Sequence, residues 1–397
     1  MKKHLKIVAL TLVVAMLAVC IAGCKSGSDS TKIKIGGIGP ITGGAAIYGQ
    51  AVKNAAEMAV EEINALEGDI QFEFKFADDE HDPEKSVNAY NTLKDWDMQI
   101  LMGTVTSLPC TAVSAESNAD RIFTLTPSGS STDCVGGYAD AEGNVTIARK
   151  DNVYQMCFSD PNQGTASAQY IKEQNLGSKI AIIYNNGDNY STGIYQKFIT
   201  EADKLGLEIV STTTFPDDTT TDFRTQINDA KTNGADLIFL PIYYTPASLI
   251  LQQAHDLQYD VKFFGVDGMD GILTVENFDV SLAEGVMLLT PFSADAEDQK
   301  TKDFVSKYEE RYKETPNQFA ADAYDCIYAL YEACKAEGIT ADMSAADICT
   351  KLIARFSGND FTFDGLTGEG MQWSASGEVA KAPKGMVIKD GAYVGLD

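Results

Sequence analysis

Basic residues and histidines are scarce in this chain of 397 residues. It has 31 Lys and Arg against 57 Asp and Glu, which gives a formal net charge of −26, and it has 3 His. This much negative charge argues against a nucleic-acid partner and against electrostatic adsorption to anionic lipid. The sequence also has no H-E-x-x-H and no cluster of Cys and His, so we expect no metal site.

The signatures of common catalytic and phosphate-binding loops are missing as well. No G-x-x-x-x-G-K-[ST], G-x-S-x-G or S-x-x-K occurs. In the loop after the first predicted strand, Thr42 stands where a dinucleotide site needs a glycine, and Pro40 removes an N–H that would face a phosphate. The stretch FFGVDGMDG, residues 263–271, has Met269 and Phe278 where a calcium loop needs oxygen ligands. We therefore expect no cofactor and no enzyme.

Cysteine pairs of recognisable spacing are also absent, although the chain has 8 Cys. An oxidising compartment would permit disulfides. The spacing does not indicate which thiols pair, so the disulfide state stays open for the cysteines downstream of residue 24: Cys110, Cys134, Cys157, Cys326, Cys334 and Cys349.

The first thirty residues are typical of an export and anchoring segment. Lys2, Lys3 and Lys6 precede roughly fifteen apolar residues, the pattern of a signal peptide. The exit, Ile21 to Cys24, resembles the bacterial lipobox, in which the cysteine thiol is lipidated. We predict a signal peptide at 1–23, lipidation of Cys24 and a polar tether at 24–31; an ordinary signal peptide that happens to contain Cys24 is the alternative. The predicted location is the outer face of the cell membrane, either periplasmic or on a Gram-positive surface, with the lipid as the only membrane contact.

From residue 32 onward, short apolar runs alternate with amphipathic segments. An irregular stretch at 129–152 separates two such runs, and residues 297–355 are predicted to be helical. This alternation predicts βα units in two parallel sheets. We expect strands at 32–39, 70–80, 98–103, 122–127, 178–186, 207–215, 235–244, 261–268, 370–377 and 384–390, and helices at 47–65, 82–96, 107–120, 190–205, 221–234 and 246–257.

Hydroxyl and aromatic residues follow the predicted strands where ligands bind in open α/β sheets. Taken singly, each has an ordinary structural explanation: Ser107 would cap its own helix, and the tyrosines would edge the core. Together they offer hydroxyls and helix N-termini for a carboxylate, one acid for an ammonium, and aromatic walls. This combination suits a free α-amino acid. The residues are Ser107, Ser128, Ser130, Tyr190, Tyr243 and Asp267.

Several phrases carry a resemblance to a known family. They are IGGIGPITGGAAIYGQ, FADDEHDPEKSVNAYNTL, MGTVTSLPCTAVSAES, IFTLTPSGSSTD, FSDPNQGTASAQYI and FFGVDGMD. In this order they resemble the leucine/isoleucine/valine-type substrate-binding proteins of ABC transporters. The resemblance implies the type I periplasmic-binding fold, in which two parallel-sheet α/β lobes with a ligand cleft are joined by three hinge crossings. We place the N-terminal lobe at 32–157 plus 290–367 and the C-terminal lobe at 158–289 plus 368–397.

The same resemblance implies roles for individual residues. Ser107 would bind the ligand carboxylate, Ser130 both carboxylate and ammonium, and the Ser128 carbonyl the ammonium. Asp267, where the family often has Glu, would pair with the ammonium. Tyr48, Tyr190 and Tyr243 would line the cleft.

The chain departs from the family pattern at a few positions. Cysteines that some members pair near the cleft correspond to His81 and Thr106, so that disulfide is absent. Leu108-Pro109 and Met269 lie where side-chain selectivity would be set. We interpret Asp270 as a solvated turn residue.

The implied function is capture of a free amino acid, branched-chain or otherwise hydrophobic, by hinge closure and its delivery to an ABC permease with its ATPases. The protein would act as a monomer. A lipoprotein of the same fold that signals ligand occupancy to a receptor is the alternative.

Overall fold

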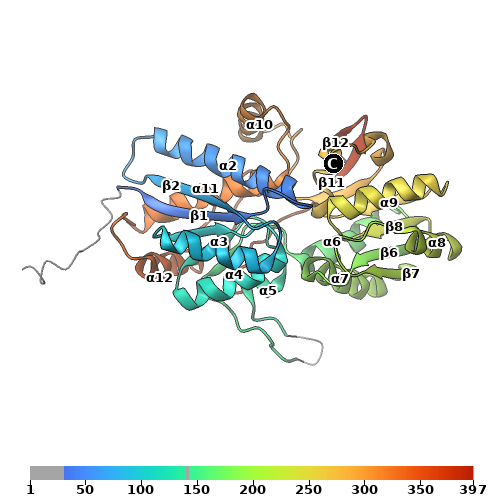
Figure 1. Cartoon of the computed structure of the whole chain (residues 1–397), viewed down its shortest axis with the longest axis horizontal. Coiled ribbons are helices and arrows are strands. Elements are labelled where there is room, and N and C mark those ends of the chain that lie inside the picture. Colours follow the sequence, from blue (N-terminus) through green and yellow to red (C-terminus); the bar gives the residue numbers. More distant parts are fainter. Residues whose placement is uncertain (1–30, 140–142, 397) are drawn as a thin grey trace, which may run out of the picture. The chain divides into compact units, whose positions relative to one another are not determined.

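Two separate sheets organise the part of the chain that the computed structural model describes, residues 31–139 and 143–396 (Figure 1). The predicted signal peptide, Cys24 and the tether up to residue 30 lie outside the described residues. Within the described ranges, no helix is both long and apolar enough to cross a membrane. The six cysteines downstream of residue 24 are buried free thiols.

The first sheet is wholly parallel and has the strand order β2-β1-β3-β4-β5. Its central strands are buried along their whole length, as expected for a parallel sheet covered by helices on both faces. The helix α2 lies beside α11, and α3 lies beside α4 (Figure 1). The elements are β1 (Ile33–Gly39), α2 (Ala46–Ala65), β2 (Phe72–Asp78), α3 (Pro83–Asp95), β3 (Ile100–Gly103), α4 (Ser107–Asp120), β4 (Phe123–Thr126), α5 (Thr132–Val135), β5 (Val153–Gln155) and, later in the chain, α11 (Gln318–Ala336).

The second sheet has the order β12-β11-β10-β9-β8-β6-β7, with β11 and β12 antiparallel at one edge. The parallel part repeats the βα alternation, and α6 packs along α7. Its elements are α6 (Asp160–Glu173), β6 (Lys179–Asn185), α7 (Asn189–Leu205), β7 (Glu208–Phe215), α8 (Arg224–Thr232), β8 (Leu237–Leu240), α9 (Tyr244–Asp256), β9 (Lys262–Gly265), β10 (Met287–Thr290), β11 (Lys384–Lys389) and β12 (Ala392–Gly395).

Three helices after β10 return the chain to the first sheet. They are α10 (Gln299–Tyr312), α11 and α12 (Ala345–Phe356). The helix α11 packs on α2, and α12 packs on β4. The chain then goes back to add β11 and β12 to the second sheet. It therefore passes between the sheets after β5, after β10 and before β11, which gives the predicted two-lobed α/β fold; the residue boundaries of the lobes stay a prediction.

The predicted elements differ from the observed ones in a few places. Residues 370–377, predicted as a strand, contribute only isolated bridges, Phe363 to Met371 and Trp373 to Val379. The helical region 297–355 is interrupted, because Lys313 adopts a left-handed conformation at the end of α10. The helices α5 and α6 and the strands β5, β10 and β12 were not predicted as elements.

Candidate functional site

Residues from both sheets meet around a small cavity at the carboxyl ends of their strands. The cavity has a volume of about 10 Å³, close to the minimum for one water molecule. An amino acid can enter only if the surrounding residues move apart. The lining residues are Tyr48, Val105, Thr106, Ser128, Tyr190, Tyr243, Asp267, Gly268 and Phe319, which include five of the seven predicted site residues.

The Tyr48 side chain links the two sheets directly. It is buried on α2, and its hydroxyl donates a hydrogen bond to the Gly268 carbonyl and accepts one from the Tyr244 backbone N–H at 3.2 Å. A second link runs from the Ile47 backbone N–H to the Tyr244 hydroxyl, also at 3.2 Å. These contacts hold α2, which packs on the first sheet, against the segments that follow β8 and β9 of the second sheet.

Asp267 lies two residues beyond the end of β9, in a short 3₁₀ turn (Asp267–Met269). One carboxylate oxygen accepts a hydrogen bond from the Tyr190 hydroxyl at 2.7 Å, and the other accepts from Gln163 Nε2 at 2.9 Å. Burial raises the pKa of this carboxyl to about 6, although these donors lower it. Among the described residues no Lys, Arg or His forms an ion pair with it, so Asp267 is a buried acid without a cationic partner.

Aromatic rings form one wall of the cavity. The rings of Tyr190 and Tyr243 stack, with centroids 4.8 Å apart and an interplanar angle of 17°. Tyr48 meets Tyr243 edge-on at 5.5 Å and also contacts Phe319. The wall is therefore apolar with hydroxyl groups at its edges, as expected for a site that binds an apolar body.

The three predicted serines lie close to this cavity in different surroundings. Ser107 is the first residue of α4, and the preceding residue, Thr106, is the N-cap, so the alternative explanation that Ser107 caps its own helix does not hold. The hydroxyl of Ser107 instead accepts a hydrogen bond from the Ser131 backbone N–H at 3.2 Å. Ser128 donates to the Val105 carbonyl at 2.5 Å. The Ser130 hydroxyl is buried without a hydrogen-bond partner among the described residues.

A second buried acid, Asp160, contacts the predicted site residue Ser130 and was not singled out from the sequence. It is the first residue of α6, its backbone N–H donates to the Ser130 carbonyl at 3.1 Å, and neither carboxylate oxygen has a hydrogen-bond partner among the described residues. Burial raises its pKa well above the usual range. The signal was present in the phrase FSDPNQG, where an acid and a proline begin a helix.

Asp270 is not the solvated turn residue that the sequence predicted. It is 6% exposed, and one carboxylate oxygen accepts a hydrogen bond from the Gln318 backbone N–H at 2.9 Å, at the start of α11. Burial raises the pKa of Asp270 to about 7. The prediction was wrong because the partner lies far along the chain and nothing in the local turn indicates it.

The His81 side chain joins the two sheets. His81 Nδ1 lies 2.8 Å from Thr106 Oγ1, and His81 Nε2 lies 3.4 Å from an oxygen of Asp218, which follows β7 of the second sheet. Burial alone would lower the pKa of His81, but the neighbouring Asp218, Asp188 and Asp79 outweigh it and raise the pKa above the usual value. The contact therefore favours a protonated imidazole.

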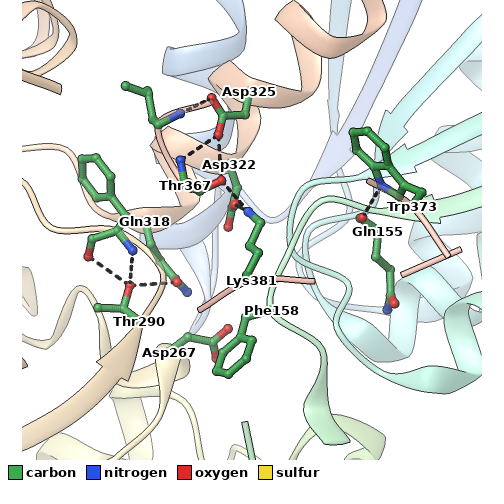
Figure 2. A network of polar contacts seen from close by, with 12 residues as sticks. Gln155, Phe158, Asp267, Thr290, Gln318, Asp322, Asp325, Thr367, Trp373 and Lys381 are labelled. Atoms are coloured by element: carbon green, nitrogen blue, oxygen red, sulfur yellow. Dashed lines mark hydrogen bonds and ion pairs between the residues drawn. The ribbon is translucent and has the colours of Figure 1, made fainter. Parts of the chain in front are cut away.

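A buried ionic network lies close to Asp267, near the segments that connect the two sheets (Figure 2). Lys381 pairs with Asp322 of α11 at 2.5 Å and also donates to the Thr367 hydroxyl. Asp325, one turn further along α11, accepts hydrogen bonds from the backbone N–H groups of Leu366 and Thr367. The segment that leads back to β11 is thus fixed to α11 by charge-assisted hydrogen bonds.

Comparison with known proteins agrees with this architecture. Residues 32–383 match the family described as "Periplasmic binding protein". The Leu/Ile/Val-binding protein homolog 3 of Brucella melitensis is 29% identical over 241 residues, 60% of this chain and 61% of that protein, so the match spans about three fifths of the relative's length.

Two solved structures are similar over nearly the whole chain. The branched-chain amino acid transporter substrate binding protein LivJ of Streptococcus pneumoniae, in complex with isoleucine, has a TM-score of 0.79 and 26% identity and covers 91% of this chain and 97% of its own. The leucine binding protein LivK of Thermotoga maritima has a TM-score of 0.80 and 23% identity, covering 92% and 98%. The predicted family and fold are confirmed: the chain belongs to the periplasmic binding protein family and has the type I fold. This is a family of binding proteins and not of enzymes.

Proposed function

We propose that this protein binds a free amino acid with an aliphatic side chain between its two sheets and delivers it to an ABC permease. The observation that carries the proposal is Asp267, a buried carboxylate without a cationic partner that faces an aromatic wall. An ammonium placed there supplies the missing charge, and hydrogen bonds to buried charged groups are among the strongest in proteins.

The ligand carboxylate is assigned to the opposite side of the cavity. The first turn of α4 has backbone N–H groups without partners inside the helix, and its dipole favours an anion there. The hydroxyl groups of Ser107 and Ser130 are added donors, and the unpartnered Ser130 hydroxyl is free to make this bond. The Ser128 carbonyl is assigned to the ammonium together with Asp267.

An aliphatic side chain is favoured by the apolar cavity lining and by the relatives. Val105, Phe319 and the rings of Tyr48 and Tyr243 offer no partner for a charged side chain. The relatives described above are named for leucine, isoleucine and valine, and the LivJ structure holds isoleucine. We place leucine, isoleucine and valine first among the ligands of this chain.

Delivery requires that the ligand-bound shape differs from the free one. Because the cavity of about 10 Å³ is too small for an amino acid, the lobes, taken as 32–157 plus 290–367 and 158–289 plus 368–397, have to separate for entry. A ligand that contacts both lobes then stabilises the closed form, which is the form a permease would recognise. In this proposal the protein is a monomer held outside the cell membrane by lipid on Cys24.

A thermal-shift screen over the common amino acids tests this function. Leucine, isoleucine or valine should raise the melting temperature by mass action, and the bound ligand should be recovered chemically unchanged. The proposal fails if no amino acid raises the melting temperature. If only charged amino acids raise the melting temperature, the proposed class of ligand is wrong. Export and lipidation are tested separately, by labelling cells with a radioactive fatty acid and comparing the natural protein with Cys24→Ser.

A further inference from the structure

A second, larger cavity lies beside α2 and shares no lining residue with the cavity at Asp267. Its volume is about 610 Å³, within the range of small-molecule sites. Its walls come from α2, the turns after β9, β10, α10, the loop at 314–317, and the edge strands β11 and β12. Parts of the chain that lie more than three hundred residues apart in sequence, from Ile47 to Tyr393, thus line one partly open cavity.

The chemistry of this cavity is apolar and acidic. Its apolar walls include Ile47, Leu288, Phe292, Met386 and Tyr393. Four carboxylates also line it, Asp270, Asp295, Glu309 and Glu314, and no Lys, Arg or His is among its lining residues.

The carboxylates occupy two different depths. Asp270 is 6% exposed, whereas Asp295, Glu309 and Glu314 are exposed at the rim. Asp270 accepts a hydrogen bond from the Gln318 backbone N–H. None of the four forms an ion pair with another described residue. The buried end of the cavity therefore holds a carboxylate that has neutral donors but no counter-charge.

We propose that this cavity is a second ligand site, for a small organic amine that carries an ammonium group on an apolar body. The ammonium would pair with Asp270, where the low-dielectric surroundings strengthen the attraction, and the apolar body would fill the space between Ile47, Phe292 and Met386. Because no basic group lines the cavity, a free amino acid would place its carboxylate among acids. The site thus selects amines over amino acids and differs from the site at Asp267.

The pH dependence of binding follows from Asp270. Burial and the nearby Asp267 carboxylate raise the pKa of this carboxyl to about 7, although hydrogen bonds from Gln318, Gly271 and Tyr393 lower it. The ammonium binds the ionised carboxylate, so affinity should increase as the pH rises through about 7 and level off above it.

The test uses 2-phenylethylamine as the probe, titrated calorimetrically into the whole mature protein. 2-Phenylethanol and 3-phenylpropionate, of similar size but neutral and anionic, serve as matched ligands. We expect the amine to bind and both matched ligands to bind at least about tenfold more weakly, since one lost charge pair of about 1.4 kcal/mol gives a factor of ten. Equal binding of the amine and the alcohol, or no binding of the amine, overturns the proposal.

Variants assign the binding to this cavity. Ala392→Trp places a bulky ring at the exposed edge strand that lines the opening and should abolish amine binding without affecting the fold. Asp270→Asn keeps the shape and an acceptor for the Gln318 N–H and should weaken binding about tenfold. Ala392→Trp should leave leucine binding at Asp267 intact, because Ala392 does not line that cavity, and this separates failure here from failure of the proposed amino-acid site.

A charge control excludes a general effect of the acidic surface. The double variant Glu309→Gln/Glu314→Gln removes two rim carboxylates and should weaken amine binding. The matched pair Glu116→Gln/Glu276→Gln removes two exposed acids outside the lining and should not. Equal weakening by both pairs, or amine binding unchanged by Ala392→Trp, contradicts the proposal.

Discussion

The Tyr48 hydroxyl is a single group that links the two sheets. It donates to the Gly268 carbonyl and accepts from the Tyr244 N–H, so a single oxygen joins α2 to two loops of the second sheet. Tyr90 offers a contrast, because its hydroxyl donates at 2.9 Å to Asp120 between two helices of the first sheet.

Replacing this hydroxyl should weaken ligand binding and leave the fold intact. We expect Tyr48→Phe to lower the affinity for the bound amino acid about fivefold, because a hydrogen bond contributes about 1 kcal/mol and this one forms only when the lobes meet. Calorimetric titration measures the affinity. Tyr90→Phe, the matched control, should change affinity little, and an equal loss in both variants would show that Tyr48 acts through general stability.

At the scale of elements, the connection between α11 and the segment before β11 depends on a buried ion pair. Lys381 and Asp322 are 0% and 1% exposed, so neither charge is compensated by water if the other is removed. The pair lies near Asp267 and beside the chain segments that connect the sheets (Figure 2).

Breaking this pair should be strongly destabilising. We expect Lys381→Met to lower the free energy of unfolding by about 3–5 kcal/mol, because it leaves Asp322 buried without a partner. Adding Asp322→Asn should recover part of the loss. The control Lys302→Met removes an exposed partner of Glu297 and should cost less than about 1 kcal/mol. Denaturant unfolding measures all three, and a small effect of Lys381→Met alone would show that the pair contributes little.

How far the sequence predicts these elements depends on what each one buries. Runs such as ILMG at β3 and LIFL at β8 are buried on every side chain and stand between turn residues, so they were predicted. The helix α6 was missed because its buried face includes polar residues, Asp160, Gln163 and Ser167, and shows little apolar periodicity. Residues 370–377 have the apolar residues of a strand but lack a neighbouring strand to pair with.

The candidate site was predictable to a similar extent and for a similar reason. Strand ends can be located from sequence, so the tyrosines, Ser128 and Asp267 were expected near one another, and they line one cavity. The long-range partners were not predictable. The pairing of Asp270 with Gln318 and the sharing of Asp267 between Tyr190 and Gln163 depend on how separate elements pack.

At the scale of the whole molecule, three titratable groups close to where the two sheets meet have raised pKa values. Burial raises the pKa of Asp267 and of Asp188 to about 6, compared with about 3.9 for an exposed Asp. Burial lowers the pKa of His81, but its acidic neighbours, Asp218, Asp188 and Asp79, raise it above the usual value. All three groups hold a proton more tightly here than they would in water.

The closed arrangement without ligand should therefore lose stability as pH rises. The contribution of the two acids is lost between about pH 4 and pH 6, and that of His81 as the pH passes through its raised pKa, above about 6.5. Small-angle scattering of the ligand-free protein should show a larger radius of gyration at pH 8 than at pH 5. His81→Gln should reduce the change, and a radius that falls with rising pH would contradict this account.

The central claim is that Asp267 receives the ammonium of a bound amino acid. A double comparison tests it most directly: calorimetric titration of leucine and of 4-methylpentanoate, which lacks the amino group, into the natural protein and into Asp267→Asn. The account predicts that removing either the amino group of the ligand or the charge of Asp267 costs about 2–5 kcal/mol of binding free energy. Removing both should cost little more than removing one. Leucine binding equally well to both proteins would contradict it.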